Sequence, residues 1–214
     1  MIHDRSVWEE RAVKAPEPQP LPGDATCDVA VIGAGYTGLA AAERLAVSGV
    51  KTVVLESAEI GEGASGRNGG QVIPGLKYDP AEILKMPGGR RLLDFVASVA
   101  DDTFRFIKDN ALDCDARQSG WIQPAVTSAQ MAKLRSRAAD WRAYGVAVQM
   151  LGAGELASLT GAAGYCGGWL DPRGGVVNPL SYVREIARKA RPAGAHVYTG
   201  TRVTGLTRVG AGWE

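Results

Sequence analysis

Hydrophobic and polar residues change their period several times in the first part of the chain, and each change predicts an element. CDVAVIG (27–33) is a continuous apolar run that ends in glycine, which is typical of a strand buried on both faces. Residues 36–48 carry apolar side chains on one helical stripe and precede Gly49, a common helix terminator. KTVVLES (51–57) predicts a second, β-branched strand. Strand, helix and strand in this order form a βαβ unit with parallel strands.

The rest of the chain alternates between helical stripes and short apolar runs. Asn178-Pro179 opens a helix in the ordinary way, with Asn as cap and Pro at the first helical position, so we assign Asn178 no catalytic role. Trp121 and Trp169 either face a substrate pocket or pack in the core, and packing is the favoured interpretation. The further predicted elements are helices over 89–110, from the cap Ser128 onward and from Asn178 to Gly194, strands over 146–151 and 165–170, and strand pairs over 114–126 (broken at Gly120) and 195–209.

Charge and composition exclude several classes of protein. The chain has 24 Lys and Arg against 23 Asp and Glu, and no basic face is evident, so we expect no nucleic-acid partner. No apolar run approaches the ~18 residues of a membrane span. The N-terminal MIHDRSVWEER also lacks the apolar core of a signal peptide. These features predict a cytoplasmic protein without a membrane span.

The cysteines and histidines suggest neither a disulfide framework nor a metal centre. Cys27, Cys114 and Cys166 stand far apart and form no CxxC pair, which favours reduced thiols. His3 and His196 are distant in the sequence and lack metal-ligand spacing. We therefore expect no metal site.

The turn after the first predicted strand contains GAGYTG, in which Gly33, Gly35 and Gly38 form the pattern G-x-G-x-x-G. The pattern alone is weak, but here a buried strand precedes it, a helix begins inside it and an acid ends the next strand. Gly33 permits the tight turn, Gly35 lets the backbone reach a pyrophosphate, and Gly38 allows close helix–strand packing. The helix N-terminus offers N–H groups to the phosphates. Glu56 lies 18 residues after Gly38, close to the ~20 expected of an acid that accepts a ribose 2′-hydroxyl. The same carboxylate would repel a 2′-phosphate, which leaves NAD or FAD.

A second glycine-rich stretch, GEGASGRNGG (61–70), follows the second strand. A simple nicotinamide-binding unit continues directly with further βα repeats, whereas a long loop inside a compact domain is usually functional. FAD is longer than the site that the first turn supplies, and a second segment along its pyrophosphate and ribityl chain meets that need. Arg67 either offsets phosphate charge or is a solvated loop charge. The two glycine segments together favour FAD over NAD.

The stretches CDVAVIGAGYTGLAAAERLA, VVLES and GEGASGRNGGQ together resemble the FAD-dependent amine and D-amino-acid oxidoreductase family, and GASGRNGGQ is the most specific of their strings. SVWEE with a proline-rich arm, LDCDARQSGWIQPA, WRAYG and GGWLDPRGGVVNPL extend the resemblance in the family order. It implies an α/β fold, with a Rossmann-like FAD-binding domain and an inserted α+β substrate domain, both incomplete in this chain. The implied boundaries are an N-terminal arm at 1–26, the FAD-binding domain at 27–112 and 178–214, and the substrate domain at 113–177.

The resemblance also implies a set of cofactor contacts. The ADP half of FAD would bind at the first turn and at Glu56, the pyrophosphate and ribityl chain near Ser65, Arg67 and Asn68, and the adenine near the backbone of Val203. Non-covalent FAD is expected, because the second glycine-rich segment holds no cysteine or histidine for attachment. The implied cofactor-binding residues are Gly33, Gly35, Tyr36, Thr37, Gly38, Glu56, Ser57, Gly63, Ala64, Ser65, Arg67, Asn68, Gly69, Gly70, Gln71 and Val203.

The activity implied by the resemblance is oxidation of the C–N bond of a small amine or amino acid, for example a gamma-glutamylputrescine-like substrate, with hydride transfer to the flavin N5. Two alternatives stay open: an enzyme of the same fold acting on sarcosine, glycine, proline or glycerol 3-phosphate, and a non-catalytic flavin-binding module. The sequence identifies no catalytic residue and no electron acceptor. Family members continue well beyond this length, so we expect an N-terminal fragment that is inactive by itself.

Overall fold

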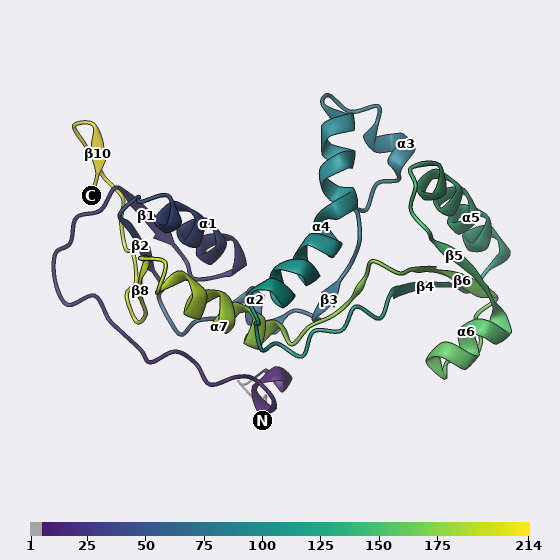
Figure 1. Ribbon diagram of the computed structural model, residues 1–214, viewed down its shortest axis with the longest axis horizontal. Helices are drawn as coiled ribbons and strands as arrows, with labels where there is room; N and C mark the ends of the chain where they lie inside the picture. Colours follow the sequence, from purple (N-terminus) through teal and green to yellow (C-terminus); the bar gives the residue numbers. More distant parts are fainter. Residues whose placement is uncertain (1–5) are drawn as a thin grey trace. The chain divides into compact units, whose positions relative to one another are not determined.

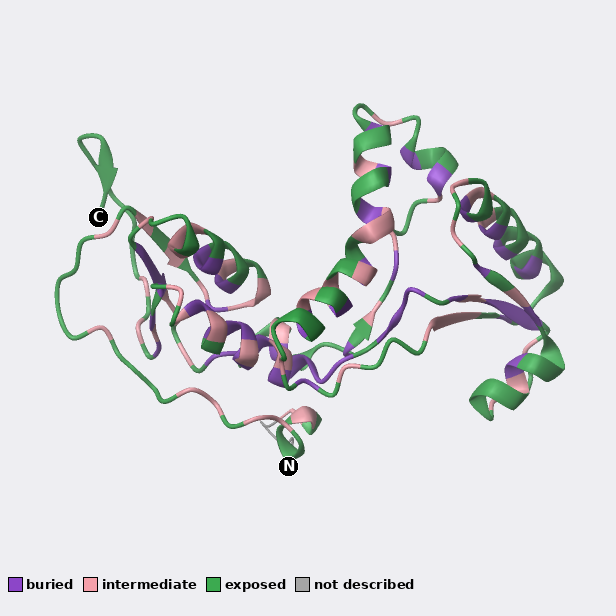
Figure 2. Cartoon of the chain, viewed as in Figure 1, coloured by how far each residue is buried: buried purple, intermediate pink, exposed green. Residues whose placement is uncertain are grey.

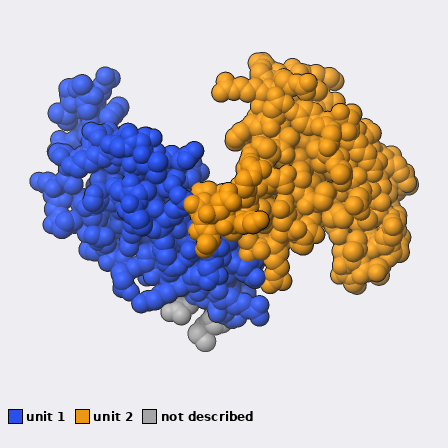
Figure 3. All heavy atoms as spheres, viewed as in Figure 1, with its two compact units in different colours: residues 1–70, 112–115, 178–214 blue, residues 71–111, 116–177 orange. Residues whose placement is uncertain are grey.

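The computed structural model describes residues 6–214, so His3 lies outside the described residues (Figure 1). The chain divides into two compact units, which Figure 3 shows in different colours. Unit 1 comprises residues 1–70, 112–115 and 178–214, and unit 2 comprises residues 71–111 and 116–177. This division differs from the predicted domains, in which residues 71–111 belonged to the FAD-binding domain.

Helix α4 (Gly89–Asp109) gives the reason for the difference. Its buried residues Leu93 and Val96 join the same core cluster as Met131 and Trp141 of the later helix α5. The predicted boundary near residue 112 followed the order of the sequence, whereas the packing of an apolar stripe decides which unit a helix joins.

Unit 1 is built on a parallel sheet with the strand order β1-β2-β8. The connection from β1 to β2 and the connection from β2 to β8 cross the sheet in the same direction. Right-handed crossovers therefore place α1 and α7 on the same face, where the two helices contact each other. The predicted βαβ unit is confirmed. The elements of unit 1 are η1 (Val7–Glu10), β1 (Val29–Ile32), α1 (Tyr36–Val47), β2 (Thr52–Leu55), α2 (Ala64–Arg67), α7 (Pro179–Ala190), β8 (His196–Tyr198), β9 (Arg208–Val209) and β10 (Gly212–Trp213).

The core of unit 1 lies between this sheet and the two helices. The middle strand β2 is buried on both faces, as its apolar run predicts. The edge strand β1 is exposed at alternate positions, and Ile32 is 60% exposed. Within residues 6–214, β1 pairs with another strand on one edge only. The side chains that fill this core include Leu39, Val53, Val54, Val183, Ile186 and Val197.

The prediction of a strand pair over 195–209 is wrong. β8 pairs with β2, and the short β9 pairs with β10. Between them, the hydroxyl groups of Thr199 and Thr201 accept the backbone N–H groups of Gln19 and Leu21. The alternating pattern therefore reflects contacts with the sheet and with the N-terminal segment, which the sequence alone does not distinguish from a hairpin.

Unit 2 contains an antiparallel sheet with the strand order β4-β6-β5 and a separate two-stranded ladder of β3 with β7. Figure 2 shows buried positions along β6 and as a stripe on α5. Trp169 is buried in the core, edge-on to Trp121, as the packing interpretation predicts. The elements of unit 2 are β3 (Gln71–Val72), α3 (Pro80–Ile83), α4, β4 (Trp121–Ala125), α5 (Ser128–Ala143), β5 (Gln149–Gly152), α6 (Ala153–Thr160), β6 (Gly167–Asp171) and β7 (Gly175–Val176).

Two local predictions in unit 2 need correction. Thr127, not Ser128, caps α5, because its side chain accepts the N–H of Gln130 while Ser128 is already helical. The predicted strand pair over 114–126 contains one strand, β4, and an isolated bridge at Arg117. The break at Gly120 is present, with φ of 89°.

Among the described residues, none of the helices combines the length and apolarity that crossing a membrane requires. Within the same residues, no cluster of three or more His, Cys, Asp or Glu side chains is arranged as a metal site.

Candidate nucleotide-binding site

The first glycine turn joins β1 to α1 in the way that its spacing predicts. Gly33 has a φ of 96°, in the region that favours glycine. A Cβ atom at Gly38 would lie 2.1 Å from the carbonyl oxygen of Gly33, so a larger residue at this position would push the helix away from the strand. The N-cap of α1 is Gly35, which has no side chain to occupy the N–H groups of the first turn.

Glu56 follows β2 directly, and its side chain reaches back to this turn. One carboxylate oxygen accepts the N–H of Ala34 at 2.7 Å. The other accepts the N–H of Ala58 at 3.0 Å and the hydroxyl of Ser57 at 3.2 Å. Glu56 therefore fixes the glycine turn to the end of the neighbouring strand. Because each carboxylate oxygen has two acceptor positions, the half-buried side chain also retains capacity for a ligand hydroxyl.

The second glycine-rich segment contacts the N-terminus of α1 through Ser65. Its hydroxyl accepts the N–H of Tyr36 at 3.1 Å, and a Cβ atom at Gly35 would come within 2.9 Å of that hydroxyl. Ser65 of the second segment therefore lies close to the backbone of Gly35. The structure brings the two glycine segments together, although 29 positions separate Tyr36 from Ser65.

Tyr36 links this contact to the start of α7. Its hydroxyl donates to the carbonyl of Pro179 at 3.0 Å and accepts from the side-chain amide of Asn68 at 3.4 Å. Burial raises the pKa of the Tyr36 hydroxyl, and burial also raises the pKa of the neighbouring Tyr182 to about 12. Both hydroxyls therefore keep their protons at neutral pH.

Residues 61–66 repeat the geometry of the first turn, which the sequence analysis missed. Gly61 has a φ of 84°, and a Cβ atom at Gly66 would lie 2.0 Å from the carbonyl oxygen of Gly61. A helix, α2, begins one residue after Gly63, as α1 begins one residue after Gly35. The signal was present in the sequence, because GEGASG has the same G-x-G-x-x-G spacing as GAGYTG. The second helix is short, since a polar Arg-Asn-Gly-Gly stretch follows in place of an apolar stripe.

The Arg67 side chain bonds within its own glycine-rich segment. Its Nε donates to the carbonyl of Glu62 at 2.6 Å, and the side chain is exposed. It contributes to a cavity of about 350 Å³ in unit 1. The cavity is lined by Ser6, Glu9, Glu59, Ile60, Gly61, Glu62, Arg67, Leu180 and Arg184.

The other predicted site residues fall into three groups. Thr37, Ser57, Gly63, Ala64 and Gly69 are exposed residues of unit 1. The side-chain oxygen of Asn68 accepts the N–H of Gly70 at 2.9 Å, which closes the turn at the end of the second segment. Val203 is half-buried in the irregular stretch after β8, and Gln71 belongs to β3 of unit 2.

Comparison with known proteins identifies the family. Residues 28–214 match the family model described as "DAO: FAD dependent oxidoreductase", which covers most of the chain. The chain belongs to the FAD dependent oxidoreductase family. FAD is the cofactor of this family, which confirms FAD over NAD as the predicted dinucleotide.

The known proteins that resemble the chain do so over about half of their own length. Gamma-glutamylputrescine oxidoreductase of Escherichia coli (strain K12) is 35% identical over 206 residues, which are 94% of this chain and 48% of that protein. The crystal structure of glycine oxidase from Geobacillus kaustophilus has a TM-score of 0.73 at 24% identity, covering 87% of this chain and 50% of that one. FAD-bound L-alpha-glycerophosphate oxidase from Mycoplasma pneumoniae has a TM-score of 0.69 at 18% identity, and the match covers 86% of this chain and 47% of that one. At these identities the two solved structures show a shared fold.

Proposed function

We propose that this chain forms the nucleotide-binding part of an oxidoreductase that oxidises the C–N bond of a small amine or amino acid. The observation that carries the proposal is the joined pair of glycine segments, in which Ser65 bonds to the first N–H of α1 and Glu56 spans the turn. The match to an FAD dependent family over residues 28–214 supports the choice of cofactor.

The residues of unit 1 fit the ADP half of FAD. The absence of a Cβ atom at Gly33 leaves the backbone open, and the N-terminus of a twelve-residue helix supplies N–H groups and a positive dipole end for phosphates. Glu56 is placed to accept a ribose hydroxyl while it holds the turn. We propose that Ser65 and Asn68 lie along the pyrophosphate and ribityl path, and that FAD binds without a covalent bond.

The chemistry of the bound flavin is the acceptance of a hydride at N5 from the carbon next to the substrate nitrogen. The protein's own task is then to bind and orient the substrate and to keep water out.

Gamma-glutamylputrescine, or a similar amine, is the substrate that we propose first. It is named by the Escherichia coli relative, which is similar to this chain over 94% of its residues. Amino acids such as glycine, and glycerol 3-phosphate, are the second candidates, because oxidases named for glycine and L-alpha-glycerophosphate share the fold.

Cofactor analysis and anaerobic reduction test this proposal together. We expect the purified full-length protein to release FAD on denaturation and to lose its oxidised-flavin absorbance when gamma-glutamylputrescine is added without oxygen. Residues 1–214 alone are expected to show no such loss of absorbance. Glycine, sarcosine, D-amino acids and glycerol 3-phosphate serve as comparison substrates. Bound NAD, or FMN in place of FAD, would contradict the cofactor assignment. Bleaching by glycerol 3-phosphate alone would contradict the C–N assignment.

A further inference from the structure

The N-terminal segment 6–21, named here the strap, runs along unit 1 and contacts the second glycine-rich segment. We propose that the strap is a positioning element of the FAD site, with Trp8 as its positioning residue. It holds α2 in the conformation in which Ser65 meets the N-terminus of α1. This inference rests on the proposed function, in which FAD binds at that terminus.

Helix α2 needs contacts from outside itself. It has four residues, and a helix of that length is unstable alone, because nucleation costs more than one turn of hydrogen bonds returns. Its last carbonyl groups also lack partners within the helix. The side-chain amide of Asn68 donates to the carbonyls of Ala64 and Ser65 at 3.2 and 3.0 Å. The carbonyls of Gly66 and Asn68 remain for other donors.

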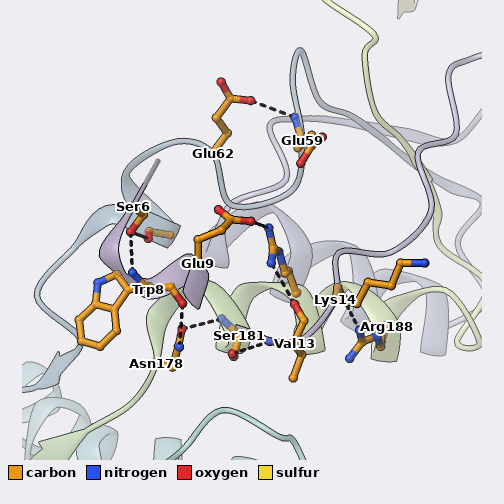
Figure 4. A network of polar contacts seen from close by, with 12 residues as sticks. Ser6, Trp8, Glu9, Val13, Lys14, Glu59, Glu62, Asn178, Ser181 and Arg188 are labelled. Carbon is orange, nitrogen blue, oxygen red and sulfur yellow. Dashed lines mark hydrogen bonds and ion pairs between the residues drawn. The ribbon is translucent and has the colours of Figure 1, made fainter. Parts of the chain in front are cut away.

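The strap supplies those donors. The Ser6 hydroxyl donates to the carbonyl of Gly66 at 3.3 Å, and the indole Nε1 of Trp8 donates to the carbonyl of Asn68 at 2.9 Å. Ser6 also accepts the backbone N–H of Trp8 at 3.3 Å, which joins the two donors in one turn of the strap (Figure 4). The short helix is therefore capped at its C-terminal end by residues 60 positions away in the sequence.

The strap is itself anchored to α7 and to the segment after β8. Asn178 donates its side-chain amide to the carbonyl of Trp8 at 3.3 Å, and Ser181 accepts the N–H of Val13 at 3.1 Å (Figure 4). Arg184, whose side chain is 6% exposed, pairs with Glu9 at 3.0 Å and donates to the carbonyl of Val13 at 2.9 Å. Most of these contacts hold the strap backbone, so its register does not depend on the side chain of Trp8.

A continuous series of contacts thus leads from Trp8 to the proposed phosphate-binding N-terminus. Trp8 donates to the carbonyl of Asn68, and the Asn68 amide donates to the carbonyls of Ala64 and Ser65 in α2. The hydroxyl of Ser65 in turn accepts the N–H of Tyr36 at the start of α1. Removing the indole N–H leaves the strap in place but frees the carbonyl of Asn68. The expected effect is a looser second segment and weaker FAD binding.

The Trp8→Phe variant tests the role of Trp8, because it keeps an aromatic ring and removes only the indole N–H donor. We expect the dissociation constant of the apoprotein for FAD, measured by fluorescence titration, to rise about three- to tenfold, the effect of one lost hydrogen bond. Trp213→Phe is the matched control, since Trp213 is 65% exposed in the β9–β10 hairpin. We expect this control to stay within twofold of the wild type.

Ser6 provides a second test that does not depend on the folding of the Trp8 variant. Ser6→Ala removes the donor to Gly66 and is expected to weaken FAD binding, whereas Ser6→Thr keeps a hydroxyl and is expected to restore it. The thermal midpoint of each apoprotein is measured alongside, because a purely structural strap would lower that midpoint and leave FAD affinity unchanged.

The strap's role is overturned if Trp8→Phe and Ser6→Ala both bind FAD within twofold of the wild type. It is equally overturned if Trp213→Phe weakens binding as much as Trp8→Phe does. A wild-type protein that binds no FAD contradicts the proposed function as well. The two failures are therefore distinguished by the wild type, which is measured first.

Discussion

Glu56 illustrates at the scale of one residue how a cofactor contact and a structural contact share a side chain. The spacing after the glycine motif predicts a ribose acceptor, and the structure adds hydrogen bonds to the N–H groups of Ala34 and Ala58. A carboxylate can accept several hydrogen bonds, so the two roles are compatible. The same side chain orders the turn before the ligand arrives.

Substitution of Glu56 separates the two roles. Glu56→Ala removes a charge-assisted contact of roughly 1.5–3 kcal/mol and is expected to weaken FAD binding about ten- to a hundredfold. Glu56→Gln keeps an acceptor for the N–H of Ala34, so its affinity for FAD should lie between those of Glu56→Ala and the wild type. The measurement is the FAD dissociation constant.

Glu59→Ala is the matched control for Glu56, because it removes an exposed carboxylate only three positions away. We expect its FAD affinity to be close to that of the wild type. Unchanged affinity in a folded Glu56→Ala variant would reduce Glu56 to a surface acid.

At the scale of elements, local sequence patterns predict where a helix lies more accurately than they predict its first residue. Helix α5 begins where a cap is expected, but Thr127 is the cap and Ser128 is the first helical residue. Both residues are good caps by type, and the choice depends on the reciprocal bonds between Thr127 and Gln130.

Two alanine substitutions test the assignment of this cap. Thr127→Ala removes the acceptor for Gln130 N–H and is expected to lower the free energy of unfolding by about 1 kcal/mol. Ser128→Ala is the control, and it should change the free energy of unfolding by less than about 0.5 kcal/mol. Urea denaturation followed by circular dichroism measures both values. A larger loss for Ser128→Ala than for Thr127→Ala would show that the cap is Ser128.

At the scale of the whole molecule, each unit has its own core. In unit 2, a buried ion pair connects the sheet to the helices α4 and α5. The Arg173 guanidinium pairs with Asp171 at 2.5 Å, donates to the carbonyl of Ala97 in α4 and lies 4.4 Å from the ring centroid of Trp141 in α5. The two charged side chains are 8% and 1% exposed. A buried charge without its partner is strongly unfavourable, so both depend on this arrangement.

Loss of this pair should destabilise unit 2. Arg173→Met leaves Asp171 buried without its ion-pair partner and is expected to lower the free energy of unfolding by about 3–5 kcal/mol. The control is Arg105→Met, which removes an exposed pair with Asp102 and should cost less than about 1 kcal/mol. Chemical denaturation followed by tryptophan fluorescence gives both values. Equal losses for the two variants would contradict a special role for the buried pair.

The sequence by itself determined the features that depend on neighbouring residues. The βαβ unit follows from its apolar runs, the tight turn at Gly33 and the close packing at Gly38 from the glycine spacing, and the start of α7 from Asn178 and Pro179. These features are local, because a positive φ, a helix cap or a hydrophobic period depends on residues only a few positions apart in the sequence.

Only the tertiary structure decided which distant segments become partners. It placed α4 in unit 2, left β1 paired on one edge within residues 6–214, and directed Arg67 to Glu62. It also brought the strap to α2 and Ser65 to the N-terminus of α1. The physical reason is that a backbone carbonyl or an apolar face accepts many partners of similar chemistry. The chain's path in space, and not the residue type, selects among them.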